Sequence, residues 1–530
     1  YIHSYRDASD EDATLKRIRE IAPEILATGS ADVVREYKEY ERFSTATLNA
    51  YIMPVMDRYL KGLGGRLAEA GYRGSIEVMR SAGGLMRADT ARRYPVQTLL
   101  SGPAAGVMGA LYIAASSGFR NLITYDMGGT STDVALIVDG EVSRTTATRI
   151  ADLPLKTNQI DIITVGAGGG SIAMTTREGA LRVGPESAGA VPGPACYGKG
   201  GQEPTVTDAN TTLARLSANY ALGGEIEVKP ELSRQVIATI AGKLGLTPEA
   251  MAEGVLKLIN TKMGSAIREI SIQRGHDPRD FALVAYGGAG PMHAVDLARD
   301  MSIPHVIIPP APGNLCAFGL LVTDLVAEES ETLLVRSQDL READLARACE
   351  RLAQDAAAIL AADGITEGVL FSFSADMRYV GQKSDIPVAI AADCMDPQAL
   401  EEAFFRAYAE RFNHTYRKAP AELVTLRATA FKAVDKLDLN KISPPDPVGT
   451  PDENGILGTR KVHFSNTGWL DCPIYDRYSI RTGVQIKGPA IIEELGSTSV
   501  IGPLDRFSID RGNNIVVEIN KESATSVAGE

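Results

Sequence analysis

The sequence predicts an α/β fold, and two observations support this class. Segments with the patterns of strands and helices alternate along most of the chain. In addition, glycine pairs follow directly after two buried-type strands: Gly128-Gly129 after 122–125, and Gly287-Gly288 after 281–285. Since ligands of α/β sheets bind where strands end, we expect a ligand site at the ends of these two strands.

The composition is that of a globular protein and excludes several classes. The chain has 530 residues, of which 44% are hydrophobic, and at roughly 150 residues per domain it has room for three or four domains. The net charge of −13 argues against non-specific nucleic-acid binding, which needs Lys and Arg to neutralise phosphates. Backbone N–H groups can still hold a small phosphate ligand. Because no apolar run approaches the roughly 20 residues of a membrane span, we expect no membrane as a partner.

Cysteine and histidine usage argues against a metal or disulfide framework. The five cysteines are scattered without a CxxC pair, and the six histidines show no HxH or HExxH spacing. We therefore expect neither a disulfide scaffold nor a Cys-rich zinc site. We expect the protein to be in a reducing, cytoplasmic environment.

In chain order, helical periodicity comes first, at 11–27 and 43–70, and a short strand follows at 76–79. Residues 99–106 indicate a strand end and then a helix of small residues to about Ser116, which would let a neighbouring backbone approach closely.

The clearest stretch begins at 122–125, a strand that enters the motif Asp126–Asp133. A second strand follows at 134–138, and the Asp139-Gly140 pair after it signals a hairpin turn. The glycine-rich motif is therefore itself predicted to be a turn between two strands.

The remaining chain continues the alternation. We expect a loop-rich insertion at 164–212, and a final section from about 440 that contains a Pro-rich linker at 443–447 and short strands. Further helices are predicted at 231–244, 248–274, 292–300, 340–363 and 398–412, and further strands at 281–285, 306–308, 369–376 and 385–392. The expected domain segments are 1–95, 96–335, 336–440 and 441–530.

The motif at 126–133 has the composition of a phosphate-binding turn. Consecutive glycines let the backbone approach a ligand, and successive N–H groups can point at phosphate oxygens. Thr130, Ser131 and Thr132 add hydroxyl donors, and the flanking Asp126 and Asp133 could hold Mg²⁺ through water. The alternative is a plain hairpin with two solvated aspartates, and we favour the phosphate interpretation.

Two other glycine stretches are less specific. Gly287–Gly290 lies between a buried strand and a helix, where it could accept a nucleoside or an α-phosphate; close strand–helix packing explains it equally well. Gly166–Ser171 could be a phosphate or substrate lid, or only a linker.

In this order, the three glycine elements resemble the second half of the ribonuclease H-like ATP-binding fold of actin, sugar kinases and heat-shock chaperone ATPases. More specifically, the chain resembles the hydantoinase/oxoprolinase family, as a hydantoinase A-type subunit. The stretches that carry this resemblance are 39–42, 48–51, 100–106, 126–135, 165–172, 193–197, 207–210, 286–291, 377–382 and 488–494.

The chain differs from the family pattern in one respect, which concerns the N-terminal phosphate loop. Members of the family open with a phosphate loop of the form Asp-x-Gly-Gly-Thr-Phe-Thr-Asp, whereas this chain has one such hairpin, at 126–133. The chain starts within Tyr1–Tyr5, which resembles the end of a strand. We therefore expect the family's N-terminal segment to be missing from it, and half of the phosphate clamp with that segment.

The resemblance implies actin-like lobes followed by a C-terminal α/β and β-rich part. It also implies ATP-dependent opening of a cyclic amide (a hydantoin, 5-oxoproline or a related lactam) through phosphorylation of the amide oxygen, with Mg²⁺ as cofactor. Asp126 would position water or Mg²⁺, with Asp133 as its helper. The nucleotide would be held by Gly128, Gly129, Thr130, Ser131, Thr132, Gly168, Gly169, Gly287, Gly288 and Gly290.

The family also implies a hydantoinase B-type partner subunit, and therefore a hetero-oligomer. Two alternative functions stay open: a subunit of an ATP-dependent ketone carboxylase, and a non-catalytic nucleotide-binding subunit.

Four further residues have competing interpretations. Glu41 and Arg42 could line a substrate cleft, although a surface ion pair is favoured. Asp208 could lie near the metal or cap a helix. Cys196 could be a nucleophile, but no histidine partner is evident.

Overall fold

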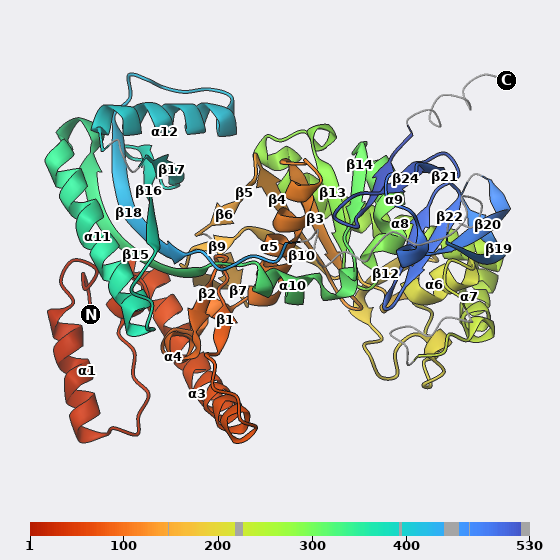
Figure 1. Cartoon of the computed structure of the whole chain (residues 1–530), viewed down its shortest axis with the longest axis horizontal. Coiled ribbons are helices and arrows are strands. Elements are labelled where there is room, and N and C mark those ends of the chain that lie inside the picture. The colour runs from red at the N-terminus through yellow and green to blue at the C-terminus, as the bar shows by residue number, and fades with distance from the viewer. Residues whose placement is uncertain (147, 218–225, 392–394, 439–454, 466, 521–530) are drawn as a thin grey trace. The chain divides into compact units, whose positions relative to one another are not determined.

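The computed structural model describes residues 1–530 except 147, 218–225, 392–394, 439–454, 466 and 521–530 (Figure 1). The chain folds into two compact units of strands and helices, which confirms the α/β class. Unit 1 consists of Tyr1–Ala104, Arg144–Ile160 and Val322–Lys436; unit 2 consists of Ala105–Ser143, Asp161–Leu321 and Leu437–Glu530. The Pro-rich linker expected at 443–447 lies outside the described residues.

Unit 1 is built on a six-stranded sheet with the order β1-β2-β15-β18-β16-β17. Its strands are β1 (Glu77–Met79), β2 (Leu85–Arg87), β15 (Leu325–Arg336), β16 (Val369–Tyr379), β17 (Ile386–Ile390) and β18 (Ala421–Lys432). Strand β18 pairs antiparallel with both β15 and β16. Helix α11 (Glu342–Ala362) packs on β15 and β18, and α12 (Pro397–Phe412) packs on β17 (Figure 1).

The N-terminal part of unit 1 contains the two predicted helices with shifted ends, α1 (Ser9–Ile21) and α3 (Glu39–Glu69), and the short helices α2 (Ser30–Val33) and α4 (Ala88–Arg93). The surface ion pair favoured for Arg42 is wrong. Its side chain is fully buried, donates a hydrogen bond to the Tyr1 carbonyl oxygen at 2.8 Å, and lies over the ring of Tyr5. Unit 1 also holds two small hairpin-like pairings, β6 (Arg144–Thr145) with β9 (Gln159–Ile160), and β7 (Thr148–Ile150) with β8 (Leu153–Leu155).

Unit 2 is built on a nine-stranded sheet with the order β10-β4-β3-β13-β14-β25-β24-β21, in which β5 also pairs with β4. The strands are β3 (Leu122–Met127), β4 (Thr132–Val138), β5 (Glu141–Val142), β10 (Ile162–Val165), β13 (Ala282–Tyr286), β14 (His305–Ile308), β21 (Ile486–Lys487), β24 (Arg506–Ile509) and β25 (Ile515–Glu518). Strands β3 and β13 are parallel, so their carboxyl ends meet at one edge of the sheet.

The predicted hairpins are present in this sheet. Strands β3 and β4 are antiparallel, and the four residues between them form the turn. Asp139 and Gly140 have φ values of +52° and +83°, the left-handed conformation that two-residue hairpin turns require.

The helices of unit 2 are α5 (Ser101–Ser116, which begins in unit 1), α6 (Val206–Thr212), α7 (Pro230–Leu244), α8 (Pro248–Ile270), α9 (Gly290–Asp300) and α10 (Leu315–Leu321). Helix α8 packs against β4 and β10, and α9 packs against β3, β13 and β14. Small residues let α5 and α10 approach closely, as expected: a Cβ on Gly319 would overlap the Ala105 carbonyl oxygen. None of the described helices is both long and apolar enough to cross a membrane.

The segment 164–212 holds more regular structure than the loop-rich insertion that we expected. Strands β11 (Ser171–Thr175) and β12 (Leu181–Ser187) form an antiparallel hairpin, and α6 follows. The C-terminal strands are divided: β19 (Ile456–Phe464), β20 (Gly468–Asp476), β22 (Ala490–Glu494) and β23 (Ser497–Ile501) form their own sheet, whereas β21, β24 and β25 extend the nine-stranded one.

Candidate functional site

The candidate site lies in unit 2, at the turn between β3 and β4. The N–H of Gly128 donates to the Ser131 carbonyl oxygen at 3.1 Å and closes this turn. Within the described part of the chain, the N–H groups of Gly129 and Thr130 have no intramolecular acceptor, and both residues are exposed. The turn therefore presents two successive unused donors, which is the arrangement that binds an anion.

Two carboxylates stand at the base of the turn. Asp126 on β3 is the direct partner of Asp133 on β4 in the antiparallel ladder, which places both side chains on one face of the sheet. Burial raises the pKa of Asp126 to about 6; the Cys316 thiol, which donates to its Oδ2 at 3.4 Å, opposes this shift, and the Asp133 charge adds to it. Burial also raises the pKa of Asp133, while a hydrogen bond from the Thr164 hydroxyl lowers it.

The Gly166–Ser171 segment packs tightly against this turn. The N–H groups of Gly169 and Gly170 donate to the carbonyl oxygens of Gly128 and Gly129, at 3.0 and 2.7 Å. A Cβ on Gly168 would lie 2.5 Å from the Gly129 carbonyl carbon and from the Thr130 nitrogen. Gly168 and Gly169 are buried. This segment thus supports the turn through its backbone, a role that neither the lid nor the linker interpretation described.

The Gly287–Gly290 segment approaches the same turn from β13. Gly287 has a φ of +80°, and a Cβ there would lie 2.4 Å from both the Asp126 Oδ1 and the Met127 carbonyl oxygen. The N–H of Ala289 donates to that same carbonyl at 2.9 Å, just before α9 begins at Gly290. Gly288 is exposed, and its N–H has no acceptor among the described residues. Only glycine at 287 permits this close packing.

The structure therefore brings together the three glycine segments that the sequence singled out, but gives their residues different positions. Gly129, Thr130 and Gly288 present exposed backbone donors, and Ser131 is half-buried. Gly287 and Gly290 are buried. The Thr132 hydroxyl is also buried and donates to the Ala167 carbonyl oxygen at 2.6 Å, so it holds two segments together rather than facing a ligand.

A Mg²⁺ ion with a phosphate group fits the carboxylates and the backbone N–H groups at this turn. Mg²⁺ is typically bound by one or two carboxylates, with waters and substrate phosphates completing its shell, and Asp126 and Asp133 supply the two carboxylates. The unused N–H groups of Gly129 and Thr130 supply donors for phosphate oxygens. In the described ranges no cluster of three or more His, Cys, Asp or Glu could hold a metal by protein ligands alone.

Asp208 has a structural role. It is the third residue of α6 and forms a capping box with Thr205. Its carboxylate also accepts from the N–H groups of Ala195 and Cys196, at 3.2 and 2.9 Å, and from the Ser233 hydroxyl at 2.7 Å. These bonds occupy the carboxylate and explain the position of Asp208 without a metal. Asp208 takes part in capping α6, but the N-cap residue is Thr205 and not Asp208 as we expected.

The neighbouring Cys196 is fully buried, and burial, reinforced by the charge of Asp208, raises the pKa of its thiol to about 12. The thiolate, which is the nucleophilic form, is therefore scarce at neutral pH.

Sequence reasoning missed two residues near the site. Cys316 reaches Asp126 from α10, and no motif around it indicates this contact. His293 on α9 is buried between Asn210 and Asn260, and burial lowers its pKa to about 3. The neutral histidine ties α9 to α6 and α8 behind the glycine segments.

Comparisons with known proteins cover nearly the whole chain. The family model described as hydantoinase/oxoprolinase matches residues 42–329, and the hydantoinase/oxoprolinase C-terminal domain matches residues 336–516. The chain is 35% identical to the caprolactamase subunit alpha of Pseudomonas jessenii, over 96% of this chain and 74% of that protein.

Two solved structures share the fold. A crystal structure of the ATP-dependent caprolactamase from Pseudomonas jessenii superimposes with a TM-score of 0.84 and 32% identity, covering 98% of this chain and 76% of that one. A nucleotide-free structure of acetone carboxylase, an enzyme of ATP-dependent acetone carboxylation, gives a TM-score of 0.76 and 26% identity, covering 98% and 75%.

Proposed function

The chain belongs to the hydantoinase/oxoprolinase family, and on this premise we propose that it is the ATP-using subunit of an enzyme that opens a cyclic amide. The observation that carries the proposal is the convergence of the 128–131 turn, the 166–171 segment and the 287–290 segment beside Asp126 and Asp133. The similarity to a caprolactamase subunit supports a lactam as substrate.

We assign unit 2 to a nucleotide-binding lobe of the actin and sugar-kinase type. The β3–β4 turn, with its unused donors, is suited to the β- and γ-phosphates, and the exposed backbone at Gly288 is suited to the nucleoside side of ATP. The parallel pairing of β3 with β13 brings both segments to one edge of the sheet.

The proposed reaction activates the amide before water attacks it. The lactam oxygen forms a bond to the γ-phosphorus of ATP while the bond from that phosphorus to the β,γ-bridging oxygen breaks, and ADP leaves. Water then adds to the activated carbon, and the carbon–nitrogen bond breaks with transfer of a proton to nitrogen, which leaves an acyl phosphate. A second water hydrolyses this acyl phosphate to the carboxylate and inorganic phosphate. From a lactam, the product is an amino acid with a free carboxylate and a free amine.

In this scheme, residues of the chain position the phosphate groups of ATP and stabilise the negative charge on them. The N–H groups of Gly129 and Thr130 donate to phosphoryl oxygens, and such preorganised donors stabilise the charge that develops during transfer. Mg²⁺, when bound, would neutralise phosphate charge. Asp126, with a pKa of about 6, is mainly ionised at pH 7.5 and can bind the cation or orient water, with Asp133 opposite it.

A ketone carboxylase is the second candidate, and the structural likeness to acetone carboxylase favours it. The higher TM-score and identity of the caprolactamase structure support the lactam as the leading substrate class. We also propose a second, B-type subunit as partner, because the caprolactamase relative is itself named a subunit.

The test is product analysis with the purified chain and the product of a neighbouring gene for a B-type subunit. The mixture is incubated with Mg-ATP, bicarbonate and a panel of hydantoins, 5-oxoproline, other lactams and small ketones. A ring-opened amino acid formed together with ADP and phosphate is the expected result. Products that carry a new carboxylate and require bicarbonate would replace this proposal with the carboxylase. Absence of stimulated ATP turnover with every compound would contradict both enzymes.

A further inference from the structure

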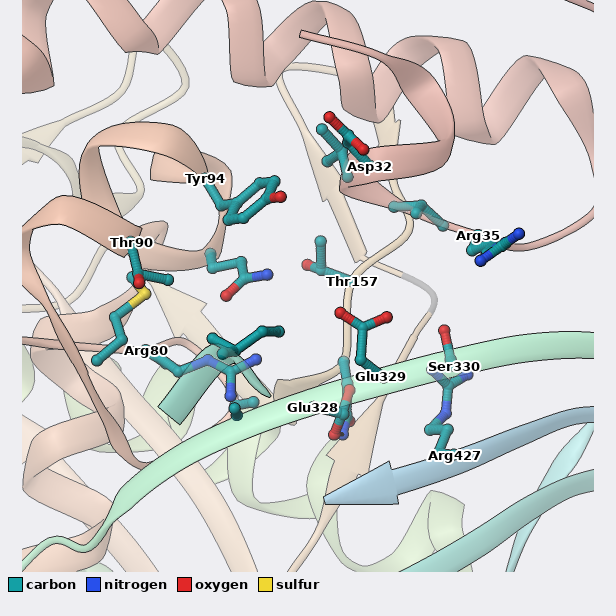
Figure 2. A pocket seen from close by; sticks show the side chains of 18 of the residues that line it. Asp32, Arg35, Arg80, Thr90, Tyr94, Thr157, Glu328, Glu329, Ser330 and Arg427 are labelled. Atoms are coloured by element: carbon teal, nitrogen blue, oxygen red, sulfur yellow. Dashed lines mark hydrogen bonds between the residues drawn. The ribbon is translucent and has the colours of Figure 1, made fainter. Parts of the chain in front are cut away.

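Unit 1 contains a polar cavity whose lining residues all belong to that unit (Figure 2). Its wall is formed by the segment 31–36, the turn that follows β1, residues 156–158 and strand β15. The cavity volume is about 80 Å³, several times the roughly 10–15 Å³ that one water molecule needs. It can therefore take a small polar molecule.

Arg80 is the first unsatisfied charge in this wall. Its side chain is only 6% exposed, and one Nη donates to the Val326 carbonyl oxygen at 3.1 Å. Its Nε is buried and has no hydrogen-bond partner. Burial lowers the pKa of Arg80, while the charges of Glu328 and Glu329 oppose this shift. Arg80 lines the cavity, and a ligand carboxylate there would pair with the charge of its guanidinium group.

Glu329 carries the second unsatisfied charge of the cavity wall. Among the described residues, no group donates a hydrogen bond to its carboxylate or forms an ion pair with it. Burial, with Asp355 as the next cause, raises the pKa of Glu329 to about 7, while the charges of Arg35 and Arg80 oppose this shift. Figure 2 shows Glu329 on β15 and Arg80 on the wall of the same cavity. A cationic ligand group would favour the ionised form of this carboxylate.

Within the described chain, the other charges of the wall have polar partners except Arg35, which lines the cavity but is itself exposed, so Arg80 and Glu329 stand out among the less exposed groups. Glu36 accepts from Lys156 and Arg427 at 2.8 and 2.7 Å. Glu328 accepts from the Asn158 amide at 2.8 Å. These contacts hold parts of the cavity wall in place and leave Arg80 and Glu329 as two opposite charges for a ligand.

We propose that this cavity binds a small zwitterion, an amino acid whose carboxylate is held by Arg80 and whose ammonium group is held by Glu329. The site consists of unit 1 residues and needs no nucleotide. Opening a cyclic amide produces a molecule of this chemical class, so the cavity would take the product of the reaction; this last link rests on the proposed function.

The test is calorimetric titration of the full chain at pH 8 without nucleotide. L-glutamate and 6-aminohexanoate serve as zwitterionic probes, and hexanoate and hexylammonium carry one charge each. We expect at least one zwitterion to bind in a 1:1 ratio, at least tenfold more tightly than either single-charge probe. Lack of binding by both zwitterions, or equal binding of hexanoate, would overturn the assignment.

Variants distinguish this cavity from other sites. Glu329→Gln should weaken zwitterion binding at least tenfold and leave hexanoate binding unchanged. It removes a carboxylate that has no partner, so the fold should tolerate it even if Arg80→Gln proves unstable. Glu331→Gln is the matched control, since Glu331 lies on the same strand, pairs with Arg351 and does not line the cavity. Unchanged zwitterion binding in Glu329→Gln would refute the site, whatever the outcome of ATP-turnover assays on the whole enzyme.

Discussion

Asp126 and Asp133 face each other across one rung of the β3–β4 ladder, at the base of the turn with unused N–H groups. Burial raises the pKa of each carboxyl, and the charge of Asp133 contributes to the shift at Asp126. Two carboxylates held this closely and partly out of water are unfavourable in the free protein. A bound cation would relieve that repulsion.

The first prediction concerns Asp126→Asn in the complete enzyme with its partner subunit. We expect ATP turnover to fall at least 100-fold, because the amide cannot provide the negative charge for Mg²⁺ or orient water as a base. The measurement is steady-state ADP release at saturating Mg-ATP. Asp139→Asn, in the exposed hairpin turn of the same sheet, is the control that should keep normal turnover. Normal turnover in Asp126→Asn would remove the residue from the mechanism.

The same substitution should stabilise the free chain at neutral pH. The pKa of Asp126 in the folded state, about 6, exceeds its ordinary value of 3.8. Between these values the folded state binds more protons than the unfolded state, so stability falls as pH rises through that window. Removing the charge should raise the free energy of unfolding at pH 7 by up to about 3 kcal/mol, and leave it nearly unchanged at pH 3. Denaturant unfolding at both pH values measures this difference.

A third prediction tests the close packing of the glycine segments. Gly168→Ala should destabilise the chain by about 1–3 kcal/mol and weaken ATP binding at least tenfold, because its Cβ would displace the backbone of Gly129 and Thr130. Gly242→Ala on α7 is the matched control, since a Cβ there meets no atom within 4 Å. The control should stabilise the helix slightly. Equal nucleotide affinity for the two variants would show that the 166–171 segment does not shape the turn.

The pH dependence of zwitterion binding gives a fourth prediction. The groups that act on Glu329 are Asp355, Arg35, Glu328 and Arg80. Because the pKa of Glu329 is about 7 in the free protein and an ammonium ligand favours its ionised form, affinity should increase as pH rises from 6 to 8. Calorimetry in buffers of different ionisation enthalpy should show proton release on binding at pH 6.5. Affinity independent of pH would exclude Glu329 as the ammonium partner.

The fifth prediction excludes Cys196 as a nucleophile. Its thiol has a pKa of about 12 and is fully buried. In the native chain at pH 8, iodoacetamide should therefore leave Cys196 unmodified, whereas the same reagent in urea should alkylate it. Cys196→Ala should keep turnover within about twofold. Rapid native labelling that abolishes activity would instead restore the nucleophile hypothesis.

The sequence predicted local structure better than contacts between distant segments. The turn at 128–131 was predictable because glycines, hydroxyls and flanking strands are contiguous. Thr132 was assigned to phosphate together with its neighbours, although alternation along a strand turns successive side chains to opposite faces. Strands β15 and β18 carry several charged residues in otherwise apolar runs, and we did not predict either of them.

The cavity of unit 1 was beyond sequence reasoning for a different reason. Arg80 and Glu329 are far apart in the chain and meet only through the sheet that joins β2 to β15. Neither lies in a motif, and an unsatisfied charge can be recognised only when its neighbours are known. The capping role of Asp208 was recognisable from its Thr-x-x-Asp spacing, whereas its bonds to the Ala195–Cys196 backbone were not.

The placement of β25 has a consequence for biosynthesis. This strand pairs with β14 in the sheet that also carries Asp126, although it is translated long after β3. The nine-stranded sheet cannot be completed on the ribosome until the residues of β25 have emerged. Until then, the edge of β14 stays open to intermolecular strand pairing. Completion of this sheet therefore depends on the translation of β25, and a nascent chain stalled before Ile515 should be prone to aggregation.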